Sequence, residues 1–259
     1  MNGRTSARPE RRGAGRVDRT PARPERGGAK RRGVEGRGAA SEELITVAVP
    51  KGRLLQESSA LFERALGVSP RALLEGTRKL AADAPEAGLR FISIRAADVA
   101  SYVEHGAAAV GIAGLDVLRE DPCDLYEPLD LGIGRCRVIV AWPKDAPALP
   151  RGVAPRVATK YVSLATQHFA RKGIPAEVIP LHGSIEVAPS LGLADAIVDI
   201  TETGETLKAN GLVIEEEVLE VTARLVVNRV ALKLHPERLR RLVDALRRVV
   251  ETRPPAKPR

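Results

Sequence analysis

The sequence contains few aromatic residues and no long apolar run. One Trp, three Tyr and three Phe make up 3% of its 259 residues, which leaves little material for the aromatic platforms on which single-stranded nucleic acids stack. No apolar stretch approaches the roughly 18 residues of a membrane-spanning helix, and no apolar segment follows the basic N-terminus as in a secretory signal. We therefore expect a cytoplasmic protein without a membrane partner.

The signatures of several enzyme classes are also missing. Cys123 and Cys136 lack CxxC spacing and are expected to be reduced thiols in the core or in loops. The four histidines are scattered, without the spacing of zinc ligands. The sequence has no Walker A motif, no GxGxxG after its first strand and no GxSxG. These absences argue against zinc-dependent, P-loop, Rossmann and serine-hydrolase sites.

Basic charge is concentrated at the N-terminus. Residues 1–40 hold 12 of the 41 Lys and Arg residues but only 4 of the 33 Asp and Glu residues, which leaves residues 41–259 neutral with 29 of each sign. The first 40 residues are rich in Arg, Gly, Pro and Ala, and we expect a disordered basic tail. This tail is either an arm for an acidic partner such as nucleic acid or a leader without function. For the neutral remainder we expect no nucleic-acid partner.

From Leu44 onward, short apolar runs alternate with segments of helical periodicity. Strands are predicted at 44–50, 89–95, 108–114, 136–143, 156–161, 176–181, 195–200 and 219–230. Helices are predicted at 54–67, 96–106, 115–121, 162–173, 182–194, 203–211 and 235–251. This alternation indicates an α/β fold with largely parallel sheets, and the Pro-rich stretch 144–155 divides it into two lobes. Ligands of such folds lie in a cleft at the carboxyl ends of the strands.

Three strand-to-helix corners carry small or charged residues that suit an anion: PKGR at 50–53, GIAGLD at 111–116 and DITETGET at 199–206. The first amides of a helix are unpaired, and the helix dipole is positive there. One such corner is common in α/β proteins, but three in one chain favour a ligand with several phosphates. Solvated turns and ordinary helix caps remain the alternative interpretation.

The third corner has more polar residues than a helix cap needs. Its three threonines and one glycine could surround a phosphate: Thr201, Thr203, Thr206 and Gly204. Asp199, at the end of the preceding strand, could accept hydrogen bonds from sugar hydroxyls. Two carboxylates, Glu202 and Glu205, count against a phosphate site unless they point away from it. Local chemistry alone leaves a phosphate cradle and a capped helix equally open.

Five stretches together resemble ATP phosphoribosyltransferase, which catalyses the first step of histidine biosynthesis: VPKGRL, SIRAADVASYVEHGAAAVGIAGLDVL, LDLGIGRCRVIVA, HGSIEVAPSLGLADAIVDITETGETLKANGL and TARLVVN. The resemblance covers residues 44–230 in the family's order. It implies a two-lobed α/β fold of the type II periplasmic-binding-protein kind, with a cleft between the lobes. Lobe I would comprise 41–134 plus 220–252, and lobe II would comprise 135–219.

The resemblance also implies partners and cofactors. The chain ends soon after the helix at 235–251, as in the short form of the family. Short forms generally act with a regulatory subunit that resembles histidyl-tRNA synthetase, often in a hetero-octamer. The substrates would be ATP and phosphoribosyl pyrophosphate, with Mg²⁺ carried by these substrates and no metal ligand in the protein.

The family's chemistry implies roles for the corner residues. N1 of ATP attacks C1 of phosphoribosyl pyrophosphate and pyrophosphate leaves, so positioning and charge stabilisation dominate catalysis. Asp199 would bind the ribose and the turn from Thr201 through Glu202, Thr203, Gly204 and Glu205 to Thr206 would bind the 5-phosphate. The catalytic residues that neutralise pyrophosphate would be Arg53 and Arg78. The nucleotide side would be formed by Lys51, Gly52, Arg95 and Asp116. A non-enzymatic ligand sensor on the same fold is the alternative.

Overall fold

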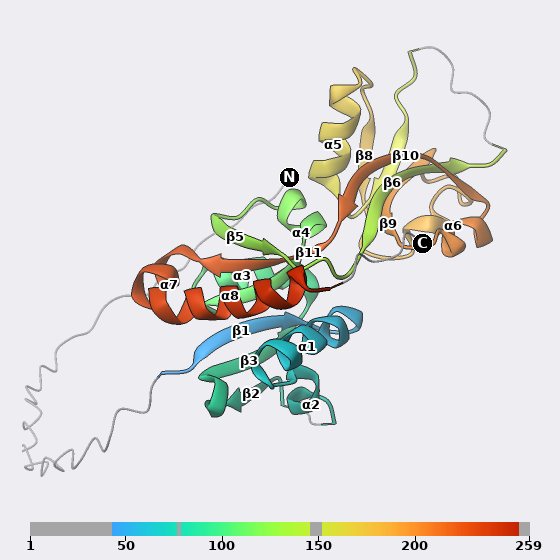
Figure 1. Ribbon diagram of the computed structural model, residues 1–259. Coiled ribbons are helices and arrows are strands. Elements are labelled where there is room, and N and C mark those ends of the chain that lie inside the picture. The colour runs from blue at the N-terminus through green and yellow to red at the C-terminus, as the bar shows by residue number, and fades with distance from the viewer. Residues whose placement is uncertain (1–42, 77–78, 146–151, 254–259) are drawn as a thin grey trace, which may run out of the picture. The chain divides into compact units, whose positions relative to one another are not determined.

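The computed structural model describes residues 43–76, 79–145 and 152–253, all within a compact unit that spans Glu42–Arg259. This unit contains two β-sheets with helices packed on them (Figure 1). The expected tail at 1–40 and the catalytic candidate Arg78 lie outside the described residues. None of the helices among the described residues is both long enough and apolar enough to cross a membrane.

The first sheet has six strands. In spatial order they are β2 (Ala81–Ala84), β3 (Leu89–Ile94), β1 (Ile45–Pro50), β4 (Val110–Gly114), β11 (Ala223–Asn228) and β5 (Leu125–Asp130). Strand β1 pairs in parallel with β3 and β4, whereas β2 and β11 run antiparallel to their neighbours. The carboxyl ends of β1, β3 and β4 therefore share one edge of the sheet.

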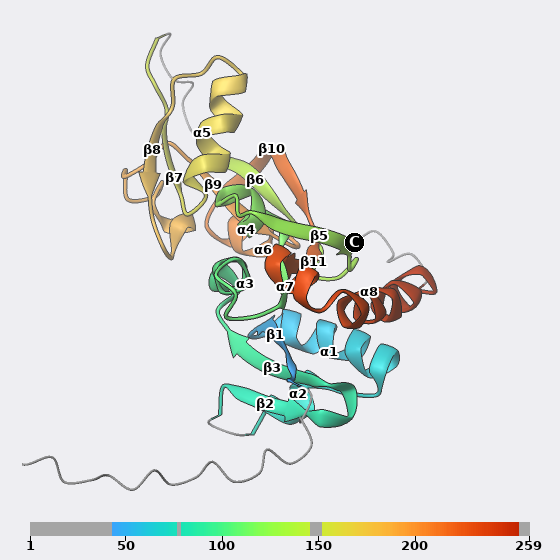
Figure 2. The same ribbon diagram turned by 90° about the vertical axis from the view of Figure 1, so that its left-hand side faces the viewer.

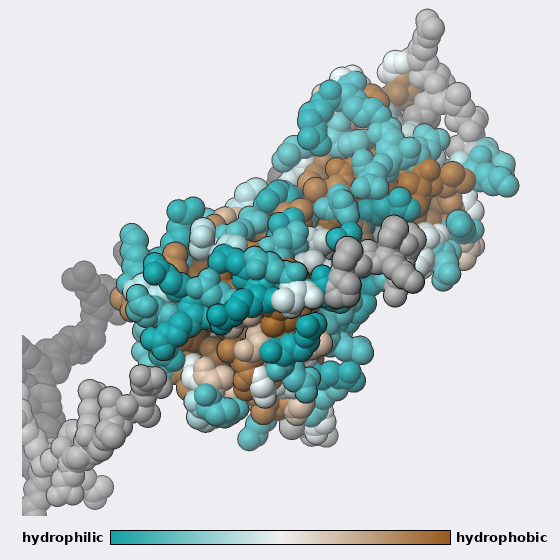
Figure 3. All heavy atoms as spheres, in the orientation of Figure 1, coloured by the Kyte–Doolittle hydropathy of each residue, from teal (hydrophilic) through white to brown (hydrophobic). Residues whose placement is uncertain are grey.

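Helices cover both faces of the first sheet. Helices α1 (Arg53–Leu66) and α8 (Pro236–Glu251) lie together on one face, and α3 (Val99–Glu104) lies on the other (Figure 2). Successive residues of β1 point to opposite faces, so Val47 and Val49 join the core under α1 and α8 while Ala48 joins the core under α3. The outward side of α8 is hydrophilic (Figure 3), as its amphipathic sequence predicts. The remaining helices of this part are α2 (Pro70–Leu74), α7 (Arg229–Leu234) and the 3₁₀ turns Pro85–Ala87 and Ala96–Asp98.

The second sheet has five strands. In spatial order they are β10 (Leu212–Val221), β6 (Cys136–Pro143), β9 (Ala196–Thr201), β7 (Arg156–Thr159) and β8 (Glu177–Pro180). Strand β7 is parallel to β8 and β9, and β6 is antiparallel to both of its neighbours. Helix α5 (Val162–Arg171) covers one face, and α6 (Glu205–Ala209) with the 3₁₀ turn Ile185–Val187 covers the other.

Helix α4 (Leu115–Glu120) connects the two sheets. It follows β4 of the first sheet, but its first residue, Leu115, is buried in the core of the second sheet. At its other end the Glu120 carboxylate accepts the backbone N–H groups of Ser163 (2.9 Å) and Leu164 (3.0 Å). These are orphan donors in the first turn of α5. The chain itself passes between the sheets after β5 and returns at Thr222, between β10 and β11.

Two of the expected elements are wrong. The segment 182–194 is not a helix; it contains a short 3₁₀ turn, and the rest is turns and irregular chain. The segment 219–230 is not one strand, because β10 ends at Val221 and β11 begins at Ala223. Strands β2 and β5, helices α2 and α7 and the part of β10 before residue 219 are additional elements. The lobe boundaries stay a prediction; the strands of the two sheets fall on either side of them, except that β10 extends to Val221.

Candidate functional site

The PKGR corner and Arg95 lie side by side at the carboxyl edge of the first sheet. The Lys51 N–H donates to the carbonyl of Ile94, the last residue of β3 (3.1 Å). Gly52 has φ +76°, a left-handed conformation that suits glycine, and it turns the chain into α1 so that Arg53 is the first helical residue. The side chains of Lys51 and Arg95 are exposed at this edge, where a ligand can reach them.

Asp116 is buried at the same edge, just after β4. A Cβ atom at Gly114 would collide with the Asp116 carboxylate, so this glycine leaves the space that the carboxylate fills. The Tyr161 hydroxyl, from the second sheet, donates to Asp116 Oδ2 (2.7 Å). Burial, together with the nearby Asp116 charge, raises the pKa of Tyr161. The phenol is therefore a fixed hydrogen-bond donor that orients Asp116.

The carboxyl edge of the second sheet carries the TETGET turn. Thr201 Oγ1 accepts the N–H of Gly204 (2.9 Å), and Thr203 Oγ1 lies 3.4 Å from the Glu205 nitrogen as its acceptor. Gly204 is buried with φ +78° and begins α6. The turn is thus held in shape by its own threonines, while the exposed Thr206 hydroxyl remains available to a ligand.

Asp199 lies at the same edge, near the end of β9. Its Oδ1 accepts the N–H of Ile200 (2.8 Å) and is 3.7 Å from Lys160 Nζ. Burial raises the pKa of Asp199, and the Glu186 charge adds to this, while the Ile200 hydrogen bond and Lys160 oppose it. A carboxylate that is poorly solvated and only loosely paired is a strong acceptor for the hydroxyl groups of a ligand.

The two carboxyl edges are joined by side chains. Arg53 Nη1 pairs with Glu202 Oε2 of the TETGET turn, although 149 residues separate them in the sequence. The Asp116–Tyr161 hydrogen bond is a second link and the Glu120 contacts with α5 are a third. The structure therefore brings the candidates from both sheets into one site, which the sequence pattern alone could only suggest.

Tyr161 and Lys160 belong to this site and were not among the predicted residues. They directly follow β7, whose carboxyl end lies beside that of β9. Lys160 Nζ also lies 4.9 Å from the centroid of the Tyr161 ring. The signal that could have revealed them is a charged and an aromatic residue at the end of a predicted strand.

Neither cysteine has the environment of a nucleophile. Cys136 lies close to the site, where it donates to the Gly134 carbonyl (3.3 Å), and burial raises its pKa to about 11. Burial and nearby carboxylates raise the pKa of Cys123 to about 11 as well. Both thiols are therefore protonated at neutral pH, where the thiolate would be needed for attack.

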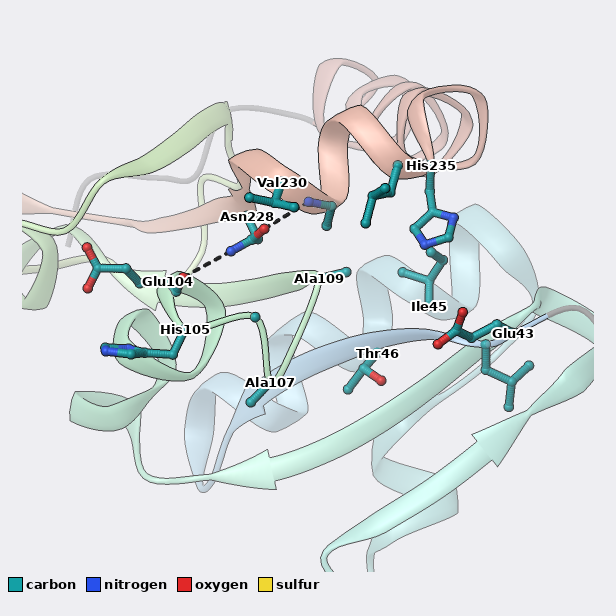
Figure 4. Close-up of a pocket in the computed structure, with 14 residues that line it drawn as sticks. Glu43, Ile45, Thr46, Glu104, His105, Ala107, Ala109, Asn228, Val230 and His235 are labelled. Carbon is teal, nitrogen blue, oxygen red and sulfur yellow. Dashed lines mark hydrogen bonds between the residues drawn. The ribbon is translucent and has the colours of Figure 1, made fainter.

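A separate hollow of about 450 Å³ lies at the amino edge of the first sheet (Figure 4). Ile45, Ala109 and Val230 contribute apolar lining. Asn228, also in its wall, donates through Nδ2 to the carbonyls of Val103 (2.8 Å) and Glu104 (3.0 Å), and its Oδ1 accepts the N–H of Ala231 (2.8 Å). That side chain is therefore satisfied by the backbone, while Glu43, Thr46 and His235 also line the hollow.

The fold places the chain in the class of two-lobed proteins of the type II periplasmic-binding kind. The Bordetella pertussis BvgS VFT2 domain matches with a TM-score of 0.53 at 15% identity, covering 83% of this chain and 90% of that chain. The alkanesulfonate-binding protein SsuA from Xanthomonas axonopodis pv. citri matches with a TM-score of 0.50 at 13% identity, covering 82% and 74%. At these identities the likeness shows the fold alone.

Comparison of the sequence is more specific. A family model for ATP phosphoribosyltransferase matches residues 95–248. The chain is 87% identical over 210 residues to the ATP phosphoribosyltransferase of Anaeromyxobacter sp. (strain K), covering 81% of this chain and 95% of that protein. It is 50% identical over 203 residues to that of Halorhodospira halophila (strain DSM 244 / SL1), covering 78% and 94%. The ATP phosphoribosyl transferase (HisG:HisZ) complex from Thermotoga maritima matches with a TM-score of 0.70 at 33% identity, covering 81% and 100%.

The chain belongs to the ATP phosphoribosyltransferase family. It is a pentosyltransferase that moves the phosphoribosyl group from phosphoribosyl pyrophosphate to N1 of ATP, in histidine biosynthesis. The expected family, fold class and enzyme activity are confirmed. The alternative of a non-enzymatic sensor is not favoured.

Proposed function

We propose that the reaction takes place where the carboxyl edges of the two sheets face each other. The observation that carries this proposal is the Arg53–Glu202 pair, which joins the PKGR corner to the TETGET turn. The two corners can then contact one substrate from opposite sides. Positioning of two reactants by fixed groups is the main catalytic resource in such a displacement.

The second sheet holds phosphoribosyl pyrophosphate in this proposal. Asp199 accepts hydrogen bonds from the ribose hydroxyls, and the turn Thr201–Thr206 surrounds the 5-phosphate. The raised pKa of Asp199 supports its role, because a carboxylate held in a poorly solvated place gains most from new donors. The left-handed Gly204 supports the role of the turn, because it lets a phosphate approach the backbone.

The first sheet holds ATP and the departing pyrophosphate. Arg53 and Arg78 neutralise the charge that develops on pyrophosphate, and Lys51, Gly52, Arg95 and Asp116 form the nucleotide side. The exposure of Lys51, Arg53 and Arg95 at one edge supports this assignment. A guanidinium suits the task because its donors form a planar fork that matches a phosphate.

Mg²⁺ supplies charge neutralisation on the phosphates, and we propose that it arrives with the substrates. Among the residues that the structure describes, no three or more His, Cys, Asp or Glu side chains are grouped as metal ligands. The carboxylates of Asp116 and Glu202 are engaged by Tyr161 and Arg53. A site of this composition fits a metal ion that is held mainly by phosphates and water rather than by protein side chains.

We also propose a cytoplasmic location and a regulatory partner that resembles histidyl-tRNA synthetase, in a hetero-octamer. The partner is supported by the matching Thermotoga maritima structure, which is an HisG:HisZ complex. Co-purification of the full chain with a candidate partner, followed by mass measurement of the intact complex, tests this directly.

The catalytic assignment is tested by Arg53→Ala in the full chain. With ATP, phosphoribosyl pyrophosphate and Mg²⁺ we expect kcat to fall more than about tenfold, a barrier increase above about 1.4 kcal/mol. Arg64→Ala is the matched control, because Arg64 is an exposed arginine near the other end of the same helix. Formation of phosphoribosyl-ATP at a near-normal rate by Arg53→Ala would contradict the role of Arg53.

A further inference from the structure

Glu202 occupies an unexpected place for a carboxylate in a phosphate-binding turn. It lies between Thr201 and Thr203, whose side chains accept hydrogen bonds from the backbone of the same turn. A carboxylate there repels a phosphate, so the turn would bind anions better without it. Its pairing with Arg53 gives this side chain a specific direction, towards the first sheet.

Arg53 is held from two sides. Its Nη1 pairs with Glu202, and its Nε lies 3.4 Å from Oε1 of Glu57, one turn further along α1. Glu57 is itself fixed, because its Oε2 accepts the N–H of Gly134 (2.8 Å). The guanidinium is therefore held between one carboxylate of its own helix and one of the TETGET turn.

The pair remains accessible to a ligand. The side chains of Arg53 and Glu202 are 43% and 36% exposed. Ion pairs with this exposure contribute little free energy, since solvent screens them. A substrate that carries a pyrophosphate group offers the same guanidinium a higher negative charge and a better geometric match. Such a substrate can replace the Glu202 carboxylate at little cost.

We propose that Glu202 is a positioning residue that holds Arg53 in place until the pyrophosphate group of the substrate displaces it. This inference rests on the proposed function, since it needs Arg53 to bind pyrophosphate. Before binding, Glu202 keeps the guanidinium directed from α1 towards the TETGET turn. On binding, Arg53 exchanges a carboxylate for phosphate oxygens, and the affinity for phosphoribosyl pyrophosphate is lowered by the free energy of the lost pair.

The test is Glu202→Gln in the full chain, compared with Glu205→Gln. Glu205 carries the same charge in the same turn, but among the described residues no ion pair joins it to Arg53. Relative to this control, we expect Glu202→Gln to lower KM and the calorimetric Kd for Mg-phosphoribosyl pyrophosphate about two- to fivefold, or about 0.4–1 kcal/mol. KM for ATP should change less than KM for phosphoribosyl pyrophosphate, because Glu202 belongs to the turn on the phosphoribosyl pyrophosphate side.

Three outcomes overturn the inference. Equal effects of Glu202→Gln and Glu205→Gln would mean that only general repulsion is at work. A higher KM in Glu202→Gln would mean that Glu202 binds the substrate itself. An undiminished effect on the calorimetric Kd in the Arg53→Ala background, which removes the guanidinium, would mean that Arg53 is not the partner. Failure of the proposed function is distinguishable, because then Arg53→Ala alone would leave turnover unchanged.

Discussion

Polar side chains at the amino edges of the two sheets have different hydrogen-bond partners from those at the carboxyl edges. At the amino edge of the second sheet, Asp195 binds Arg156 through both carboxylate oxygens, with Nη2–Oδ1 at 2.8 Å and Nε–Oδ2 at 3.2 Å, and it also accepts the Arg156 backbone N–H at 2.8 Å. At the other end of the same strand, β9, Asp199 is close to a single backbone donor and a lysine at 3.7 Å. Four residues apart, one aspartate is saturated and the other is not.

The same contrast holds in the first sheet. At its amino edge Asn228 satisfies three backbone groups and leaves no hydrogen-bonding capacity unused towards the hollow of Figure 4, apart from one lone pair. At its carboxyl edge, Arg53 and Asp116 bond instead to side chains of the second sheet. Asp195 and Asn228, at the amino edges, are thus engaged within the fold, whereas we propose that Arg53, Asp116 and Asp199, at the carboxyl edges, contact the substrates. This comparison makes four predictions.

The largest effect is expected from Asp199→Asn. It should lower kcat/KM for phosphoribosyl pyrophosphate about 10- to 100-fold, because charge-assisted hydrogen bonds worth about 1.5–3 kcal/mol are lost.

The same substitution, Asp199→Asn, should make the folded protein more stable at neutral pH. The folded-state pKa of Asp199 is raised, so its ionised form costs stability above that pKa, and the cost disappears as pH falls towards 3.8, the pKa of an unperturbed aspartate. Kinetics and thermal unfolding between pH 4 and 8 measure both; a lower Tm at pH 7 would contradict the stability argument.

The second effect is expected from Asn228→Ala at the amino edge. The loss of a helix cap and of two donors to backbone carbonyls should cost about 2–4 kcal/mol and lower Tm by about 4–15 °C. Turnover of the folded enzyme should stay within about twofold. Asn228→Asp keeps the acceptor for Ala231 but turns a carboxylate oxygen towards the Val103 and Glu104 carbonyls, so it should be at least as destabilising at neutral pH. A large loss of turnover below the melting range would show that the amino edge takes part in function.

Tyr161→Phe should have a smaller effect on stability and a measurable one on activity. The buried Asp116 carboxylate loses its donor, at a cost of about 1–3 kcal/mol. Because we propose that Asp116 belongs to the nucleotide side, we expect KM for ATP to rise more than KM for phosphoribosyl pyrophosphate. Tyr126→Phe is the control, since Tyr126 is 47% exposed. Steady-state kinetics with each substrate varied in turn would refute the assignment if both KM values rose equally.

The smallest effect is expected from Asp195→Asn. The Arg156 hydrogen bond lowers the pKa of Asp195 in the folded state, so the pair stabilises the fold above the unfolded value near 3.8 and loses this as pH falls through the folded pKa. We expect Tm at pH 7 to fall by about 1–4 °C, or roughly 1 kcal/mol or less. The difference in Tm between Asp195→Asn and wild type should shrink below about pH 4. Its sign at pH 7 is opposite to that expected for Asp199→Asn. Unequal kcat values at pH 7 would break the comparison between the edges.

The spacing of apolar residues in the sequence predicted those elements in which the buried residues recur at regular intervals. Helix α8 was predictable because Leu239, Leu242, Leu246 and Val249 repeat at helical spacing and all are buried. The segment 182–194 has a similar apolar content, but Gly183, Pro189 and Gly192 interrupt it. Its Ile185, Ala188 and Ala194 reach the core of the second sheet from turns. Burial there reflects tertiary packing, which overrides the apparent period.

Most of strand β10 was not predicted, because its sequence lacks the alternation of apolar and polar residues that is typical of a strand. The sequence LVIEEEVLEV places three consecutive glutamates in an edge strand with two register shifts, so regular alternation is lost. The corners of the site could be predicted from the sequence, because each is one short stretch in which glycine and charged residues directly follow a strand. The links Arg53–Glu202 and Asp116–Tyr161 join residues of different sheets. No local pattern contains them.

Helix α4 has a consequence for how the molecule unfolds. Leu115 completes the core of the second sheet and Glu120 supplies the cap that α5 lacks in its own sequence, yet both belong to a helix that follows directly from the first sheet. The second half cannot finish its core or close the end of α5 until the first half is in place. Residues 43–253 should therefore melt in one cooperative transition, with coincident near-ultraviolet and far-ultraviolet signals, rather than as two independently stable halves.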